Sequence, residues 1–108
     1  MINVDGKTLI LEENKIELDY NIRKFIEFST QIIVLVYDDI IIPNNVIAFD
    51  KQGNMLWSIN DILKIKKTTG NVDISMTDNG YLNVYSSLGI VFCIDVEERS
   101  LIEKKYLR

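Results

Sequence analysis

The chain has 108 residues, the usual size of one domain, and its 47% hydrophobic and 26% charged residues are an ordinary globular balance. No apolar run approaches the roughly 20 residues that a membrane helix needs, which argues against a membrane protein. Acidic residues outnumber basic ones by 16 to 12, and the net charge of −4 repels phosphate backbones. We therefore expect one domain, residues 1–108, that does not bind nucleic acid directly and that favours a basic partner.

The N-terminus and the cysteine content both indicate the cytoplasm. Residues Met1 to Lys7 lack the basic start, apolar centre and small-residue cleavage site of a secretory signal. Cys93 is the only cysteine, so no internal disulfide can form, which fits a reducing compartment and argues against zinc-finger and CxxC motifs.

Short strands are predicted throughout the first part of the chain. Thr8 to Glu12 and Lys15 to Asp19 flank Glu13-Asn14 and predict a first hairpin. Asn21 to Phe28 fits helical spacing as well as strand alternation, and we favour the strand. Ile32 to Tyr37 is apolar on both sides of the pleat and rich in β-branched residues, which predicts a central strand covered on both faces.

A second hairpin is predicted around Gly53. This glycine ends the turn between Val46 to Asp50 and Asn54 to Ile59, and glycine readily takes the left-handed conformation that closes a short hairpin. By alternation Trp57 shares a face with Met55 and with the last residue of this strand, which predicts that Trp57 is a core anchor.

The segment after this hairpin, residues 60–67, is ambiguous. Ser58 to Asp61 could cap a short helix that runs to Lys67. Leu63 and Ile65 alternate with lysines equally well, as in a strand. Both readings stay open.

Further turns and strands are predicted in the last third of the chain. Ile74 to Thr77 leads through Asp78-Asn79-Gly80 into Tyr81 to Tyr85, and the Asn-Gly pair favours a type I′ turn. Turns then connect this strand to Ile90 to Asp95 and to Leu101 to Leu107.

A faint internal repeat links the second hairpin to the last one. Three residues recur at a spacing of 45: Val46, Asp50 and Leu56 match Val91, Asp95 and Leu101. This is the period of a β-propeller blade, but a closed propeller needs at least about four blades, and the chain has room for barely two. The predicted fold is therefore mainly β: an antiparallel meander of about eight strands that forms a curved sheet, a small sandwich or a partly open barrel, with at most one short helix.

The residue types argue against an enzyme, a metal site and a bound cofactor. The chain has no histidine, which removes the usual general base and the commonest metal ligand. Cys93 lies between apolar neighbours, which predicts an inert core residue with a raised thiol pKa. The residues from Asp73 to Gly80 lack the ligand spacing of a calcium loop, and the five glycines form no phosphate-binding motif.

What remains is a surface for a protein partner. Alternation places Tyr81, Asn83 and Tyr85 on one face of their strand, where they form either an exposed stripe or a second packed face. Carboxylates at predicted strand ends could meet a partner's basic side chains, although solvated turns are the more ordinary explanation for each. The candidate contact residues are Asp38, Asp39, Tyr81, Asn83, Tyr85, Glu97 and Glu98.

Several of these hairpins resemble a known group of proteins. The residues Asn45 to Trp57, Gly80 to Tyr85, Phe92 to Asp95 and Leu101 to Lys105 look like a group of small bacterial β proteins with propeller-like half-blades, some of which are similar to immunity proteins of contact-dependent inhibition and related polymorphic toxin systems. The chain departs from the pattern at Val96 to Ser100, where related hairpins carry a glycine.

The resemblance implies a cytoplasmic, non-enzymatic immunity protein that binds a toxin domain and blocks its active site. Many such toxins are nucleases with basic clefts, which would suit a partner of net charge −4. The alternative is a self-associating structural β module whose edge strands pair between subunits.

Overall fold

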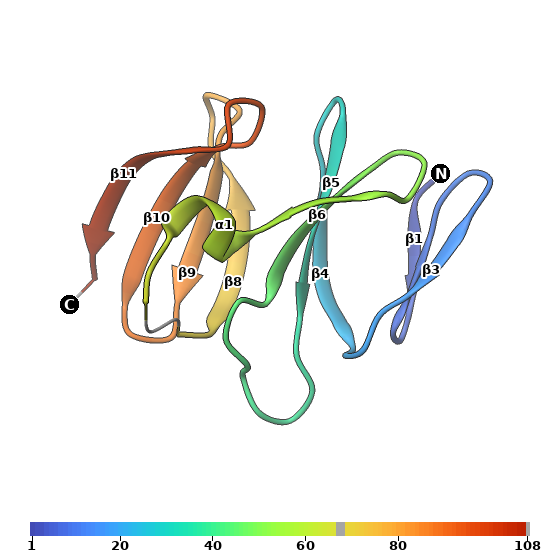
Figure 1. Ribbon diagram of the computed structural model, residues 1–108, viewed down its shortest axis with the longest axis horizontal. Coiled ribbons are helices and arrows are strands. Elements are labelled where there is room, and N and C mark those ends of the chain that lie inside the picture. The colour runs from blue at the N-terminus through green and yellow to red at the C-terminus, as the bar shows by residue number, and fades with distance from the viewer. Residues whose placement is uncertain (67–68, 108) are drawn as a thin grey trace.

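Three antiparallel sheets make up the fold in the computed structural model, which describes residues 1–66 and 69–107 (Figure 1). The strand orders are β1-β2-β3, β4-β5-β6-β7 and β11-β10-β9-β8, so each sheet is a meander of sequence neighbours. The first sheet comprises β1 (Asn3–Asp5), β2 (Thr8–Ile10) and β3 (Lys15–Glu17). The second comprises β4 (Ile22–Glu27), β5 (Gln31–Val36), β6 (Val46–Asp50) and β7 (Met55–Ser58). The third comprises β8 (Asn71–Met76), β9 (Leu82–Ser86), β10 (Ile90–Asp95) and β11 (Ser100–Tyr106).

The mainly β, antiparallel fold is confirmed. The described residues form eleven strands in an open stack of sheets rather than a closed barrel. β1 (Asn3–Asp5) was not predicted.

β5 is the centre of the molecule, as its composition predicts. All six of its residues are buried. Ile33 and Leu35 face a core shared with the third sheet, whereas Ile32 and Val34 face a second core shared with the first sheet. Figure 1 shows the second sheet between the other two, so a strand with two apolar faces is required at this place.

Buried amides join the second and third sheets at both ends of this interface. At one end, Gln31 donates from Nε2 to the Val96 carbonyl (3.0 Å), and its Oε1 accepts from the Trp57 indole N–H (3.0 Å). At the other, Asn45 Nδ2 donates to the carbonyls of Val36 (3.0 Å) and Asn71 (2.9 Å), and Asn45 Oδ1 accepts from the Asn71 backbone (2.9 Å). These bonds fix the two sheets relative to each other, because buried amides are costly when unpaired.

The two ambiguous segments take different structures. Residues 21–28 contain β4, so the strand is confirmed there. After β7 the chain forms a five-residue helix, α1 (Ile59–Leu63), in which Asp61 Oδ2 accepts from the Ser58 backbone N–H at 2.9 Å. The helix ends where Lys64 turns left-handed (φ 53°), and Lys67 lies outside the described residues. Among the described helices, none has the length and apolar content to cross a bilayer.

Glycines close the predicted hairpins. Gly53 (φ 99°) donates to the Asp50 carbonyl (3.1 Å) in the β6–β7 turn, as expected. The β8–β9 turn is also present, but the type I′ prediction was wrong. Gly80 has a positive φ of 84° and Asn79 does not, whereas type I′ requires a positive φ at both central residues. The loop is instead a three-residue turn, in which Gly80 donates to the Thr77 carbonyl at 3.0 Å.

The repeat predicted from the sequence corresponds to a repeat in topology. β6 and β10 are each the third strand of a four-stranded meander, and each ends in an aspartate. Asp50 Oδ1 accepts from two backbone N–H groups of the following turn (both 2.9 Å), and Asp95 Oδ1 does the same (both 3.1 Å). Hydrogen bonds from the Asn54 backbone and side chain hold the pKa of Asp50 below its ordinary value.

Trp57 is buried as predicted, but the predicted face of Met55 is wrong. Trp57 is 2% exposed, whereas Met55 is 59% exposed. The β6–β7 register shifts between Ala48 and Phe49, and this bulge interrupts the alternation at Leu56. Met55 therefore does not follow Trp57 into the core.

Candidate functional site

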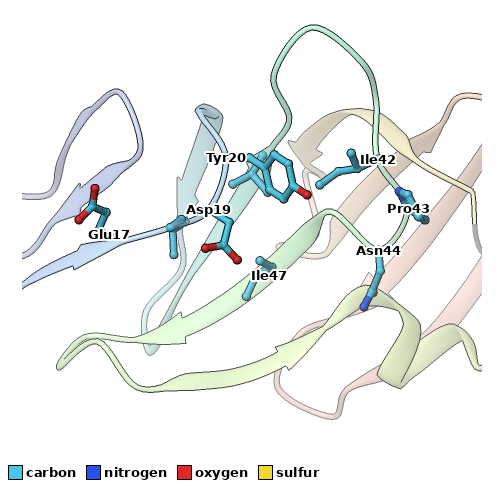
Figure 2. Close-up of a pocket in the computed structure, with 9 residues that line it drawn as sticks. Glu17, Asp19, Tyr20, Ile42, Pro43, Asn44 and Ile47 are labelled. Atoms are coloured by element: carbon cyan, nitrogen blue, oxygen red, sulfur yellow. The ribbon is translucent and has the colours of Figure 1, made fainter.

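An open groove lies between the β3–β4 connection and the long β5–β6 loop (Figure 2). Its volume is about 480 Å³. The lining comes from the end of β3, the connection after it, the end of β5, the β5–β6 loop and β6: Glu17, Leu18, Asp19, Tyr20, Val36, Ile42, Pro43, Asn44 and Ile47. In Figure 2 the side chains of Tyr20 and Ile42 project toward the space between the two loops, and Asp19 lies near Ile47.

Asp38 fixes the first wall of this groove. Its Oδ1 accepts from the backbone N–H of Asn21 (2.9 Å) and from the Asn21 side chain (2.8 Å), and Tyr37 donates to the Asn21 carbonyl (3.0 Å). Arg23 adds bonds to the carbonyls of Tyr37 and Asp38 (both 2.7 Å) and stacks over the Tyr37 ring at 4.8 Å. The residues before β4, including Tyr20, are therefore held against the end of β5.

Asn44 and Gly70 fix the second wall. Asn44 has a left-handed backbone (φ 55°), donates to Ser58 Oγ (3.0 Å) and accepts from the Asn60 backbone N–H (2.8 Å). Pro43 forms an isolated bridge with Gly70, which lies so close to the loop that an added Cβ would be 2.1 Å from Ile41 Cγ2. The β5–β6 loop is thus anchored to both the second and the third sheet.

The groove has the chemistry of a site for a cationic, partly aliphatic side chain. Its lining contains two carboxylates, Glu17 and Asp19, and within the described residues no lysine or arginine. Tyr20 is 37% exposed and offers an aromatic face, while Ile42 and Ile47 offer apolar contacts. A lysine or arginine can place its stem on such a surface and its charge on the carboxylates. In the part of the chain that the structure describes, no group of three or more acidic or cysteine side chains is arranged to hold a metal ion.

The predicted residues Asp38 and Asp39 lie in the loop that forms this groove, outside its lining. Asp38 is half-buried and bound to Asn21, so its carboxylate has a role in the fold. Asp39 is exposed and adds negative charge beside the groove.

The predicted tyrosine stripe lies on the outer face of the third sheet, none of whose strands contributes to the groove lining. Leu82 and Val84 are fully buried, whereas Tyr81, Asn83 and Tyr85 are half-buried on the opposite face, as the alternation predicts. No other sheet covers this face among residues 1–66 and 69–107. A shallow hollow of about 460 Å³ lies there, and the Tyr85 hydroxyl is 3.0 Å from Ser75 Oγ.

Glu97 and Glu98 are exposed in the β10–β11 turn. Glu97 Oε2 accepts from the Thr30 hydroxyl in the β4–β5 turn (2.6 Å). Asp39 follows the opposite end of β5 from Thr30, so the predicted acidic residues lie at two ends of the molecule and form no single patch.

Cys93 corrects the prediction of a core residue. Phe92 and Ile94 point into the core, which leaves Cys93 half-buried on the outer face, where it lines the hollow beside Asn83. The raised thiol pKa is confirmed: partial burial and the nearby Glu103 carboxylate both disfavour the thiolate. The neutral thiol is a poor nucleophile.

Sequence reasoning missed the groove itself. Glu17, Asp19 and Tyr20 are polar residues at a strand end, and Ile40 to Pro43 is an apolar run that we did not assign to any strand. The signal for the groove was this unassigned apolar run, of which Ile42 and Pro43 line the groove.

Comparison with known protein families gives one identification. Residues 1–106 match the family described as "Domain of unknown function (DUF7957)". The chain belongs to this family. Comparison with curated proteins and with solved structures gave no match. The DUF7957 assignment covers all three sheets, so the groove and the outer face of the third sheet both lie within the family's domain.

Proposed function

We propose that this DUF7957 protein is a non-enzymatic, cytoplasmic immunity protein that binds a bacterial toxin domain, of the basic nuclease type, and neutralises it by blocking its active site. The observation that carries the proposal is the groove under the β5–β6 loop, which combines two carboxylates with aromatic and aliphatic lining. Nuclease clefts present lysines and arginines to phosphates, and the same side chains suit this lining.

The net charge of −4 supports the same partner. Opposite charges on two proteins speed their encounter, and the acceleration falls as salt rises. The sequence of the hairpins resembles that of immunity proteins, and this resemblance adds the biological context of a toxin delivered between bacteria.

The groove also suits rigid recognition. Asp38, Asn44 and Gly70 fix both walls through hydrogen bonds and close backbone contact. A preformed site loses little conformational entropy on binding, which favours tight inhibition.

The test is a binding and protection assay with the toxin domain encoded beside this protein. We expect co-purification of the two proteins, rescue of cells that express the toxin, and an association rate that falls as salt rises. If neither binding nor rescue is found for any toxin encoded in that neighbourhood, the proposal is wrong.

Variants then identify the contact surface. Asp19→Lys should weaken toxin binding by about tenfold or more, because it places a cation opposite a basic partner. Replacing both Glu97 and Glu98 by lysine, or truncating both Tyr81 and Tyr85 to alanine, tests the two other predicted surfaces. If the toxin binds at the β10–β11 turn, the glutamate reversal should weaken binding. If it binds on the outer face of the third sheet, the tyrosine truncation should weaken binding. Loss of affinity only in these variants would move the site away from the groove.

A further inference from the structure

The outer edge of β11 is a free strand edge. β11 pairs with β10 on one side, and in the described chain no strand pairs with its other side. All seven of its residues are exposed. Such an edge presents unpaired N–H and C=O groups that can pair with a strand of another molecule.

The charged side chains along this edge are self-complementary. In both directions from Lys104 the strand has one charged residue and then two exposed apolar ones: Glu103, Ile102 and Leu101 on one side, and Lys105, Tyr106 and Leu107 on the other. A second copy in antiparallel orientation, related by a two-fold axis at Lys104, therefore places Glu103 opposite Lys105 twice. Apolar residues also lie on both flanks, but the bulge at Ile102 puts the directly opposite ones on different faces. Ile102 and Leu107 line the outer hollow, whereas Tyr106 shares a face with Lys104 and Leu101 is opposite the buried Ile94. We propose that two copies of this chain pair through β11 in this register.

The faces of the two charged residues agree with this register. Glu103 and Lys105 are opposite Cys93 and Val91 on β10, and both line the outer hollow, so they lie on one face of the sheet. A two-fold axis perpendicular to the sheet leaves the outer faces of both copies on the same side of the continuous sheet, so Glu103 of one copy and Lys105 of the other lie on one face. An axis at Glu103 or Lys105 would instead place that residue opposite its own copy and lose both Glu–Lys pairs.

Three features of the strand limit its affinity. Glu103 Oε1 and Lys105 Nζ already lie 3.9 Å apart as an ion pair within one chain, so pairing across the axis replaces an existing contact. The two Lys104 residues face each other at the axis, although each ammonium also lies over the Tyr106 ring of its own chain at 5.5 Å. A register shift at Cys93/Ile94 leaves Ile102 without a partner on β10, so the regular part of the edge is short. We therefore expect a weak, concentration-dependent dimer.

The assembly closes at two copies. The two-fold axis uses β11 of both chains, and the opposite edge strand of this sheet, β8, lies against β4 and β5. An isologous contact of this kind forms a dimer rather than a fibre. This pairing is independent of the toxin binding proposed above, since the groove lies in the first and second sheets.

The test is sedimentation equilibrium of the full chain over a concentration series. The wild type should dimerise, and Glu103→Lys and Lys105→Glu should each weaken the dimer by about tenfold, because each creates like-charge pairs across the axis. An equimolar mixture of the two variants should form a heterodimer of at least wild-type affinity, since every position 103 then faces an opposite charge at position 105. Lys104→Thr should tighten the homodimer by removing the central Lys–Lys contact.

Glu13→Lys and Lys7→Glu change the net charge equally at exposed sites of other loops and should leave the dimer unchanged. Circular dichroism checks that all variants are folded. A monomeric wild type at millimolar concentration would overturn the proposal, as would failure of the two reversed variants to associate with each other.

Discussion

Gln31 is a buried amide that joins the start of β5 to two distant segments. It is 5% exposed, accepts from the Trp57 indole and donates to the Val96 carbonyl. Trp57 belongs to the second sheet and Val96 to the turn of the third, so one side chain satisfies polar groups from both sheets. Hydrogen bonds of this kind add little net energy when made but are costly to lose in a dry interior.

Replacing Gln31 with leucine tests this role. Gln31→Leu keeps the approximate volume but leaves the Trp57 N–H and the Val96 carbonyl without their partners. The free energy of unfolding should fall by about 2 to 6 kcal/mol, at roughly 1 to 3 kcal/mol for each of the two orphaned groups. Urea unfolding followed by circular dichroism measures it. In a Trp57→Phe background the same change should cost about 1 kcal/mol less, and strictly additive costs would show that the two side chains are not coupled.

Arg99 is a residue in a conformation that suits glycine. It has a φ of 54° at the last position of the β10–β11 turn, and Gly53, with a φ of 99°, occupies the last position of the shorter β6–β7 turn. This is the segment in which the resembling hairpins carry a glycine. The departure seen in the sequence therefore coincides with a strained backbone in the structure.

Arg99→Gly should stabilise the protein by about 0.5 to 1 kcal/mol, because relief of the left-handed strain exceeds the added entropy of the unfolded chain. Gly53→Ala is the matched control with the opposite sign. Its φ is 99°, and the new Cβ would lie 2.9 Å from Ile16 Cδ1. Thermal unfolding of both variants measures the effects, and a destabilised Arg99→Gly would mean that the arginine side chain contributes more than its strain costs.

At the scale of elements, the β5–β6 loop packs closely against the residue that precedes β8. Gly70 bridges to Pro43, and the Ile42 carbonyl would lie 2.7 Å from an added Cβ. The backbone of Gly70 has an ordinary φ, so the requirement for glycine here is space rather than conformation. The shape of the groove is thereby linked to the packing of the third sheet.

Gly70→Ala should destabilise the protein by about 1 to 3 kcal/mol and should also displace the wall of the groove that Ile42 and Pro43 form. Combining it with Ile41→Ala removes one of the clashing groups and should restore part of the stability. Urea unfolding gives the first quantity, and affinity for the groove's partner gives the second. Full stability and unchanged affinity in Gly70→Ala would show that the loop can move at no cost.

The sequence predicted elements better than it predicted the site. β5, the glycine turns and the Asp50/Asp95 repeat all follow from local patterns, and the structure contains them. The alternation gave the wrong face for Met55, because the β6–β7 bulge adds one residue, Leu56, and so reverses the face of the residue before it. The groove is made by segments from β3, β5 and β6 that no local pattern brings together.

At the scale of the whole molecule, the two cores that lie between the three sheets meet at one central strand, β5. Leu9 and Phe49 belong to the core between the first and second sheets, while Trp57 and Ile74 belong to the core between the second and third. β5 contributes residues to both cores, so loss of packing on one of its faces should affect the other. This arrangement predicts one cooperative unit instead of three independent hairpin sheets.

Truncation of Leu9 tests this cooperativity. Leu9 is fully buried in the first sheet, so Leu9→Ala should cost about 2 to 5 kcal/mol. Because Trp57 lies in the other core, its fluorescence reports on the opposite side of β5. We expect the urea midpoints from fluorescence and from circular dichroism to fall together by the same amount. Leu88→Ala, at a residue 68% exposed in the β9–β10 turn, should leave both within about 0.5 kcal/mol of the wild type. A circular dichroism transition that moves while the Trp57 signal stays in place would mean that the first sheet unfolds on its own, and that β5 does not couple the two cores.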